Sequence, residues 1–389
     1  MGELLWPGDA RAGDVFTDEA FLAAMVQVEQ AWLDALVSVG LASPTSLSTP
    51  PLDAVAGGSE SGGNPVIPLV KALRSQSDAV HRGLTSQDVV DTALVLCLRE
   101  AVGRVLVDLE RAARALARLA REHRASVMAG RTLTQYAVPA TFGLKAAGWL
   151  AGLTEAADDL HRVREALPVQ IGGAAGTLAA VVELAGEQED PVGVAAGLVR
   201  AVAQSLDLQG GAPWHTRRTP LTVVADALVT LSDTWGHVAG DIALLSRPEI
   251  AELREAAGGG SSTMPGKANP VLSILLQRHA LAAPGLAATL HVAAATYVDE
   301  RPVGGWHAEW DTLRTLARRS VVAASQAADL LEGLVVDTDR MAARVWEAED
   351  TLHAEQRSIS GRTEGDYLGA TDLIIDNILE RAGRRWENL

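Results

Sequence analysis

Residues 94–119, LVLCLREAVGRVLVDLERAARALARL, determine the fold class of this 389-residue chain. Apolar side chains recur there every three or four positions, at Leu94, Leu98, Val102, Val105, Leu109, Ala112, Leu116 and Leu119. An α-helix turns once in about 3.6 residues, so this spacing places these side chains on one helix face. No proline occurs between residues 69 and 138 to interrupt the pattern. The stretch therefore predicts one long helix.

Alanine-rich segments repeat this pattern along the rest of the chain, at about residues 140–167, 192–206, 221–245, 271–296 and 309–333. No comparable stretch alternates with period two, so we predict an all-α fold. The segment that begins at residue 271 is apolar on more than one face, which indicates a helix surrounded by other helices. Packing between subunits explains this pattern, and charges such as Arg278 argue against a membrane bundle.

Composition narrows the classes of partner. Lys plus Arg number 33 against 49 for Asp plus Glu, and the formal net charge of −16 disfavours nucleic acid and anionic membranes. The single cysteine, Cys97, lies among apolar residues and is predicted to be a buried, inert thiol. The N-terminus lacks a signal-peptide pattern, and no apolar run of 18 residues is evident, so we expect a cytoplasmic protein.

Proline and glycine divide the chain. They cluster in residues 43–68, which we interpret as a connection within an N-terminal region, and again in the stretch QIGGAAGT after Pro168. After residue 336 the sequence becomes more charged and less apolar. We predict three parts: an N-terminal helical domain (1–90), a central helical bundle (91–337) and a short C-terminal helical domain (338–389).

A second loop, GGGSSTMPGKANP at residues 258–270, carries the strongest motif. Its simplest interpretation is a Gly/Pro linker with solvated polar residues. The pattern G-S-S-x-M-P-x-K-x-N-P, however, resembles the signature loop of the fumarase/aspartase superfamily, and a chance match at eight fixed positions is improbable. We call residues 258–270 the signature loop.

The resemblance implies that the signature loop carries out proton transfer beside a carboxylate. Ser261 is then the general base, and its alkoxide is stabilised by loop N–H groups and by the ammonium of Lys267. Ser262 and Asn269 bind the substrate carboxylate, where negative charge accumulates in the aci-carboxylate intermediate. The three glycines allow the loop to close over substrate.

The stretch HRGLTSQDVVDTALVL, residues 81–96, is by itself a helix N-terminus that Thr85 or Ser86 could cap, with Asp88 near the positive end of the dipole. It also resembles the H-x-G-x-T-S-x-D-x-x-D-T-A segment of the adenylosuccinate lyase and carboxymuconate cycloisomerase branches. That resemblance implies that Thr85 and Ser86 bind a substrate carboxylate, which suits a helix N-terminus. His81 is a catalytic candidate, with an ordinary hydrogen-bonded histidine as the alternative.

A third stretch, GRTLTQYAVPATFGLKAAGWL at residues 130–150, departs from the superfamily pattern. The amine-eliminating lyases have G-x-T-H-x-x-x-A-x-P, in which the histidine takes part in acid catalysis. Leu133 occupies that position here. An amine must be protonated to leave, whereas a carboxylate leaves as the anion. The leucine therefore favours the cycloisomerase branch. Thr132 and Gln135 are predicted to contact substrate, and Arg301 to bind a further carboxylate through its planar fork.

The resemblance implies an enzyme that interconverts 3-carboxy-cis,cis-muconate and 4-carboxymuconolactone in protocatechuate catabolism. A nitrosuccinate-type or adenylosuccinate-type lyase and an inactive structural homologue are the alternatives. It also implies three helical domains around a five-helix bundle, and a homotetramer with a twenty-helix core and active sites shared between subunits. The histidines of the sequence form no H-E-x-x-H cluster and no phosphate-loop motif is present, so we predict no metal and no cofactor. The predicted partners are a small polycarboxylate and further copies of the chain.

Overall fold

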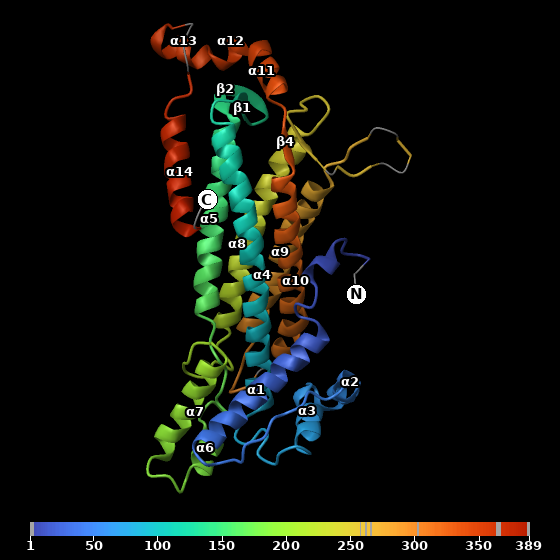
Figure 1. Ribbon diagram of the computed structural model, residues 1–389, viewed down its shortest axis with the longest axis vertical. Helices are drawn as coiled ribbons and strands as arrows, with labels where there is room; N and C mark the ends of the chain where they lie inside the picture. Colours follow the sequence, from blue (N-terminus) through green and yellow to red (C-terminus); the bar gives the residue numbers. More distant parts are fainter. Residues whose placement is uncertain are drawn as a thin grey trace. The chain divides into compact units, whose positions relative to one another are not determined.

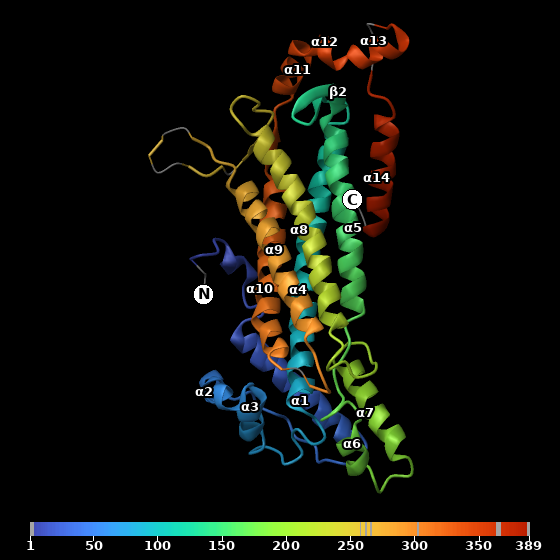
Figure 2. The ribbon, with the colours of Figure 1, turned by 180° about the vertical axis from the view of Figure 1, so that it is seen from behind.

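The computed structural model describes residues 4–256, 258–260, 263–264, 267–301, 303–362 and 367–386. Within these residues the protein is all-α, with fourteen α-helices and two short antiparallel strand pairs (Figures 1 and 2). Its contacts group the chain into two compact units. Unit 1 comprises Met1–Arg104, Leu160–Leu228 and Pro284–Val321, and unit 2 comprises Val105–Asp159, Val229–Ala283 and Val322–Leu389.

Five long helices supply segments to both units, because the division falls inside each of them. They are α4 (Ser86–Glu122), α5 (Phe142–Glu165), α8 (Thr219–Leu245), α9 (Val271–Ala295) and α10 (Gly305–Glu332). Each begins and ends within a few residues of a segment predicted from periodicity, apart from α4, which begins eight residues earlier. The repeated apolar side chains of α4 are buried, including Leu98, Val102, Val105 and Leu109. Burial of this face is what stabilises so long a helix.

Unit 1 also contains the shorter helices of the N-terminal part and of the region after α5. They are η1 (Asp9–Ala12), α1 (Asp18–Ser38), α2 (Leu52–Gly62), α3 (Val66–Leu73), α6 (Ala179–Leu184) and α7 (Pro191–Ser205). Helix α7 packs against α1 (Figures 1 and 2). The interpretation of residues 43–68 as a mere connection is wrong, because α2 and the start of α3 lie there. A Cβ at Gly58 would lie 2.9 Å from Pro68 Cβ, so glycine allows these two helices to approach.

Unit 2 contains a β-hairpin, a second strand pair and the C-terminal helices. Its strands are β1 (Val127–Thr132), β2 (Gln135–Thr141), β3 (Leu253–Glu255) and β4 (Leu334–Val336). Its additional helices are α11 (Thr338–Glu347), α12 (Glu349–Leu352), α13 (Ala354–Ser360) and α14 (Thr371–Arg385). Helices α11 and α12 pack on the hairpin, where Leu352 and Ala129 are both fully buried (Figure 1). Asp337 caps α11, because its Oδ1 accepts from Arg340 N at 2.9 Å.

The hairpin is the main departure from the all-helical expectation. Its strands are joined by two residues, Leu133 and Thr134, with positive φ angles of 48° and 69°. A two-residue turn with both residues in the left-handed region usually contains asparagine or glycine. Neither is present here, so the sequence carried no turn signal. The fold class is still all-α, and the three-domain division stays a prediction.

Two helices, α1 and α9, are long and apolar enough to span a membrane by length and composition alone, each with a mean hydropathy of 1.3. The expectation that no 18-residue apolar segment exists was therefore wrong. Of the window in α1, 61% is buried inside the protein, as in the core helix of a soluble protein. Only 28% of the window in α9 is buried, which leaves an apolar face on this helix.

Candidate active site

The N-terminus of α4 is held by one carboxylate, that of Asp88, which is fully buried in unit 1. Asp88 Oδ1 accepts from Gly172 N at 2.9 Å, His215 Nε2 at 2.9 Å and Gln170 Nε2 at 3.0 Å, and Oδ2 accepts from Gly173 N and Thr85 N, both at 3.0 Å. Asp88 thus connects α4 to two distant chain segments. The sequence analysis interpreted Asp88 only as a charge near the helix dipole, and it did not predict these connections.

Arg301 lies directly beside the predicted carboxylate-binding residues of α4. Its Nη2 donates to Thr85 Oγ1 at 2.5 Å and to Ala174 O at 3.0 Å, and its Nε donates to Ala174 O at 3.1 Å. Arg301, Thr85 and Ser86 are all partly buried. The structure therefore brings together two predicted residues that are 216 positions apart. A guanidinium beside a helix N-terminus is suited to bind an anion.

His81 precedes this helix in a turn with a positive φ of 62°. Its backbone N donates to Glu29 Oε2 at 3.1 Å, and its ring Nδ1 lies 2.6 Å from Glu29 Oε1. Glu29 comes from α1 and is fully buried. Sequence analysis missed Glu29, because its importance comes from a contact with a residue 52 positions away, about which local sequence carries no information.

Beneath this region lies a buried cluster centred on Arg218. Arg218 Nη1 donates to Asp91 Oδ2 at 2.6 Å, its Nη2 donates to Glu309 Oε2 at 2.6 Å, and Trp306 Nε1 donates to Asp91 Oδ1 at 2.8 Å. Burial raises the pKa of Glu309, and the ion pair with Arg218 opposes that change. The cluster joins α4, α8 and α10 within unit 1.

The two histidines beside tryptophans have different surroundings. His215 is buried, and its Nε2 contacts Asp88 and Gln170 as part of the polar network at α4. His307 is exposed, packs its ring 4.7 Å from Trp310 by centroid distance, and places its Nε2 2.8 Å from Gly63 O. His307 therefore packs against an aromatic ring, whereas His215 makes hydrogen bonds within a buried polar network.

In unit 2, the predicted residues Thr132 and Gln135 pair across the tip of the hairpin. Both are exposed, and Leu133 between them is 95% exposed. Arg131, next to this tip, anchors the hairpin, because its Nη2 donates to the buried Glu252 at 2.9 Å. Burial lowers the pKa of Arg131, but the combined effect of Glu252 and Tyr136 leaves it raised. The side chain at position 133 therefore projects outward from a fixed tip.

The signature loop is closed at its base by backbone pairing. Gly259 N donates to Asn269 O at 3.0 Å, and Asn269 N donates to Gly259 O at 2.8 Å. A Cβ at Gly259 would lie 2.3 Å from Val271 Cγ2, so a larger residue at this position would require Val271 to move. Lys267 is exposed, whereas Ser261 and Ser262 lie outside the described residues. Glu255 holds the first turn of α9, because its Oε1 accepts from Ser273 N at 2.9 Å.

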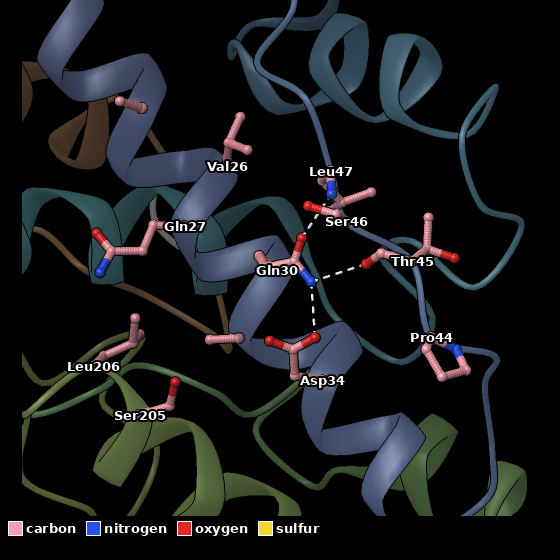
Figure 3. A pocket seen from close by; sticks show the side chains of 12 residues that line it. Val26, Gln27, Gln30, Asp34, Pro44, Thr45, Ser46, Leu47, Ser205 and Leu206 are labelled. Carbon is pink, nitrogen blue, oxygen red and sulfur yellow. Dashed lines mark hydrogen bonds between the residues drawn. The ribbon is translucent and has the colours of Figure 1, made fainter.

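A groove of about 790 Å³ lies elsewhere in unit 1, between α1, the segment 44–47 and the end of α7 (Figure 3). The polar groups of this groove make hydrogen bonds with one another. Gln30 donates to Asp34 Oδ1 at 2.7 Å and to Thr45 O at 3.0 Å, and accepts from Leu47 N at 2.7 Å. None of the predicted site residues lines this groove. We therefore assign the site to the predicted residues and not to the groove.

The predicted residues fall into two groups. His81, Thr85, Ser86 and Arg301 belong to unit 1, whereas Thr132, Gln135, Lys267 and Asn269 belong to unit 2. Within the described ranges, no cluster of three or more His, Cys, Asp or Glu side chains is arranged to hold a metal ion.

The all-α fold and the signature-loop motif are typical of lyase-type enzymes, and the chain belongs to the Lyase family of the fumarase/aspartase superfamily. The family profile matches residues 51–285. Over 353 residues the chain is 44% identical to nitrosuccinate lyase of Streptomyces davaonensis, covering 85% of this chain and 73% of that protein. Over 369 residues it is 41% identical to 3-carboxy-cis,cis-muconate cycloisomerase of Pseudomonas aeruginosa, covering 89% and 78%.

Solved structures agree with this assignment. The crystal structure of 3-carboxy-cis,cis-muconate lactonizing enzyme from Pseudomonas putida superposes with a TM-score of 0.81 at 30% sequence identity, covering 97% of this chain and 99% of that one. The protein is therefore similar throughout to enzymes of the lyase and isomerase kind.

Proposed function

We propose that this protein is a cycloisomerase that interconverts 3-carboxy-cis,cis-muconate and 4-carboxymuconolactone. The observation that carries the proposal is Leu133, which occupies the outward-facing tip of the hairpin where amine-eliminating lyases have an acidic histidine. A leucine cannot protonate a departing amine. A carboxylate leaves as an anion, so this reaction needs no acid at that position.

In the direction of lactone opening, Ser261 removes a proton from the carbon beside a carboxylate. The electron pair is delocalised into that carboxylate as an aci-carboxylate, for which Lys267 and Asn269 supply charge and hydrogen bonds. The C–O bond to the lactone oxygen then breaks, and the oxygen departs as part of a free carboxylate. In the forward direction, the substrate carboxylate adds to the double bond and the adjacent carbon receives the proton.

A second substrate carboxylate fits the end of α4. Arg301 and Thr85 are in direct contact there, and the backbone of the helix N-terminus contributes positive partial charge. Ser86, Ser262, Thr132 and Gln135 are proposed to complete the binding of the polycarboxylate.

The test is a spectrophotometric assay with the purified protein. We expect the ultraviolet absorbance of the conjugated muconate to fall with time, and Ser261→Ala to abolish the change while the protein stays folded by circular dichroism. Ser75→Ala, the same change at an exposed serine outside the proposed site, serves as the matched control and should leave turnover within about threefold of the original. Failure of the parent protein to consume the muconate would refute the proposed substrate.

A second candidate reaction is elimination of nitrite from nitrosuccinate to give fumarate, favoured by the 44% identity to nitrosuccinate lyase. Proton removal by Ser261 and departure of nitrite, also a weak base, again need no acid at position 133. Colorimetric detection of nitrite together with fumarate, with no turnover of the muconate, would assign this reaction instead.

The proposed assembly is a cytoplasmic homotetramer with shared active sites, built from three helical domains. Helix α9 supports it, because this helix exposes the apolar side chains Ile274 (52%), Leu281 (85%) and Val292 (66%). Such a face on a helix is typical of a surface that binds another copy of the chain. Native mass spectrometry should give the mass of four chains, and a fully active monomer would contradict the proposal.

A further inference from the structure

Glu29 stands out among the side chains that the proposed chemistry does not use. It lies on α1 among buried apolar residues such as Val28 and Leu33, yet it is itself fully buried. Burying a carboxylate is unfavourable unless its oxygens accept hydrogen bonds. Its neighbour Gln30 instead faces the groove of Figure 3, so α1 carries two polar residues with separate roles.

Both oxygens of Glu29 accept from one residue, His81, which is 52 positions further along the chain. Oε2 accepts from the backbone N at 3.1 Å, and Oε1 lies 2.6 Å from ring Nδ1. An ionised carboxylate can only accept, so the short contact requires a proton on Nδ1. The ring is therefore held as the tautomer in which Nδ1 donates to Glu29, and Nε2 points away from this contact.

The turn that carries His81 is fixed by α1 at a second point. Trp32 lies one turn after Glu29 on the same helix, and its Nε1 donates to Arg82 O at 2.7 Å. At the next residue, Gly83, φ is 82°, and a Cβ would lie 2.8 Å from Val181 Cγ2. The backbone path from residue 81 to 83 is thus closely determined, and the imidazole plane is set by Glu29.

We propose that Glu29 is a positioning residue for the reaction, because it fixes the tautomer and orientation of His81 and leaves Nε2 as the only ring nitrogen able to contact substrate. The inference rests on the proposed function in one respect, which is that His81 contacts substrate. The tautomer itself is a property of the ligand-free protein. It can be measured whether or not the proposed substrate is turned over.

The decisive variant is Glu29→Gln, which has nearly the same shape. An amide oxygen can still accept from His81 N, but the amide nitrogen then faces Nδ1 and must donate to it. The ring proton is therefore expected to move to Nε2. By analogy with other carboxylate–histidine pairs, kcat should fall by about 100-fold or more, with a smaller change in KM.

The experiment is magic-angle-spinning NMR of ¹⁵N-histidine-labelled, ligand-free protein, with the His81 signals assigned by their loss in His81→Asn. We expect a protonated Nδ1 in the original protein and an unprotonated Nδ1 in Glu29→Gln. Trp32→Phe is the matched control, since it removes a hydrogen bond to the same turn but leaves the carboxylate. It should retain the original tautomer and most of kcat.

Several outcomes would overturn the proposal. One is an original protein whose His81 Nδ1 carries no proton, a result that does not require Glu29→Gln to fold. A second is an unchanged tautomer in folded Glu29→Gln, and a third is a loss of kcat that Trp32→Phe reproduces in full. If neither the muconate nor nitrosuccinate is turned over while the two tautomers are as expected, the proposed function fails and the geometric assignment of Glu29 stands.

Discussion

Replacing Asp88 with asparagine should destabilise the protein by an amount that the structure allows us to estimate. Three donors meet Oδ1 and two meet Oδ2. In its better orientation, an asparagine keeps the three bonds and turns its NH₂ toward the N–H groups of Gly173 and Thr85. The buried Gly173 N without an acceptor costs about 1–3 kcal/mol, and the partly buried Thr85 N costs no more than that, which gives about 1–6 kcal/mol in total. That is a large part of the roughly 5–15 kcal/mol that stabilises an ordinary domain.

Urea unfolding at fixed protein concentration measures this effect, with the free energy of unfolding taken from the midpoint at constant slope. The matched control is Asp78→Asn, the same chemical change at an exposed carboxylate, for which we expect about 0.5 kcal/mol or less. Because Thr85 N is one of the two orphaned donors, KM for the polycarboxylate should also rise. Equal midpoints for the two variants would refute the energetic role given to Asp88.

Further predictions concern four separate sites. Burial, with a smaller effect from Glu100, raises the pKa of Cys97 to about 12, so the thiol is neutral at pH 8. Iodoacetamide should therefore label Cys97 only in urea, and labelling of the folded protein would contradict this. Arg301→Lys should raise KM about tenfold or more without unfolding the protein, because an ammonium cannot reproduce the planar fork. Leu281→Glu should reduce the native mass below four chains. Gly259→Ala should lower thermal stability and kcat/KM, since its methyl group would overlap Val271; unchanged values of both would show that the loop base can adapt.

The sequence predicted the long helices well because their apolar period survives along whole segments. It failed at the hairpin, where the left-handed turn is made by Leu133 and Thr134 without the usual glycine or asparagine. It also failed at residues 43–68, where glycines permit close helix packing and were taken for a linker. In both places tertiary contacts outweigh local preference.

The candidate site was predictable only in part. Thr85 and Arg301 were selected from motifs, but periodicity contains no information about a contact across 216 positions. Glu29 and Asp88 were not recognised as organising residues, because their importance comes from the donors that surround them in space. Lys267 is exposed and Asn269 pairs with Gly259 through its backbone, and the roles of both residues, like that of Ser261, stay predictions.

The exposed tip of the hairpin has a consequence for how this family changes its chemistry. The side chain at position 133 is 95% exposed, whereas Asp88 at the N-terminus of α4 is embedded in buried polar contacts. Under the proposed function, a new side chain at the tip would alter which leaving groups are accepted, while folding would be nearly unaffected. Divergence toward new substrates can therefore begin there, one residue at a time, with the recognition of the shared acid group preserved.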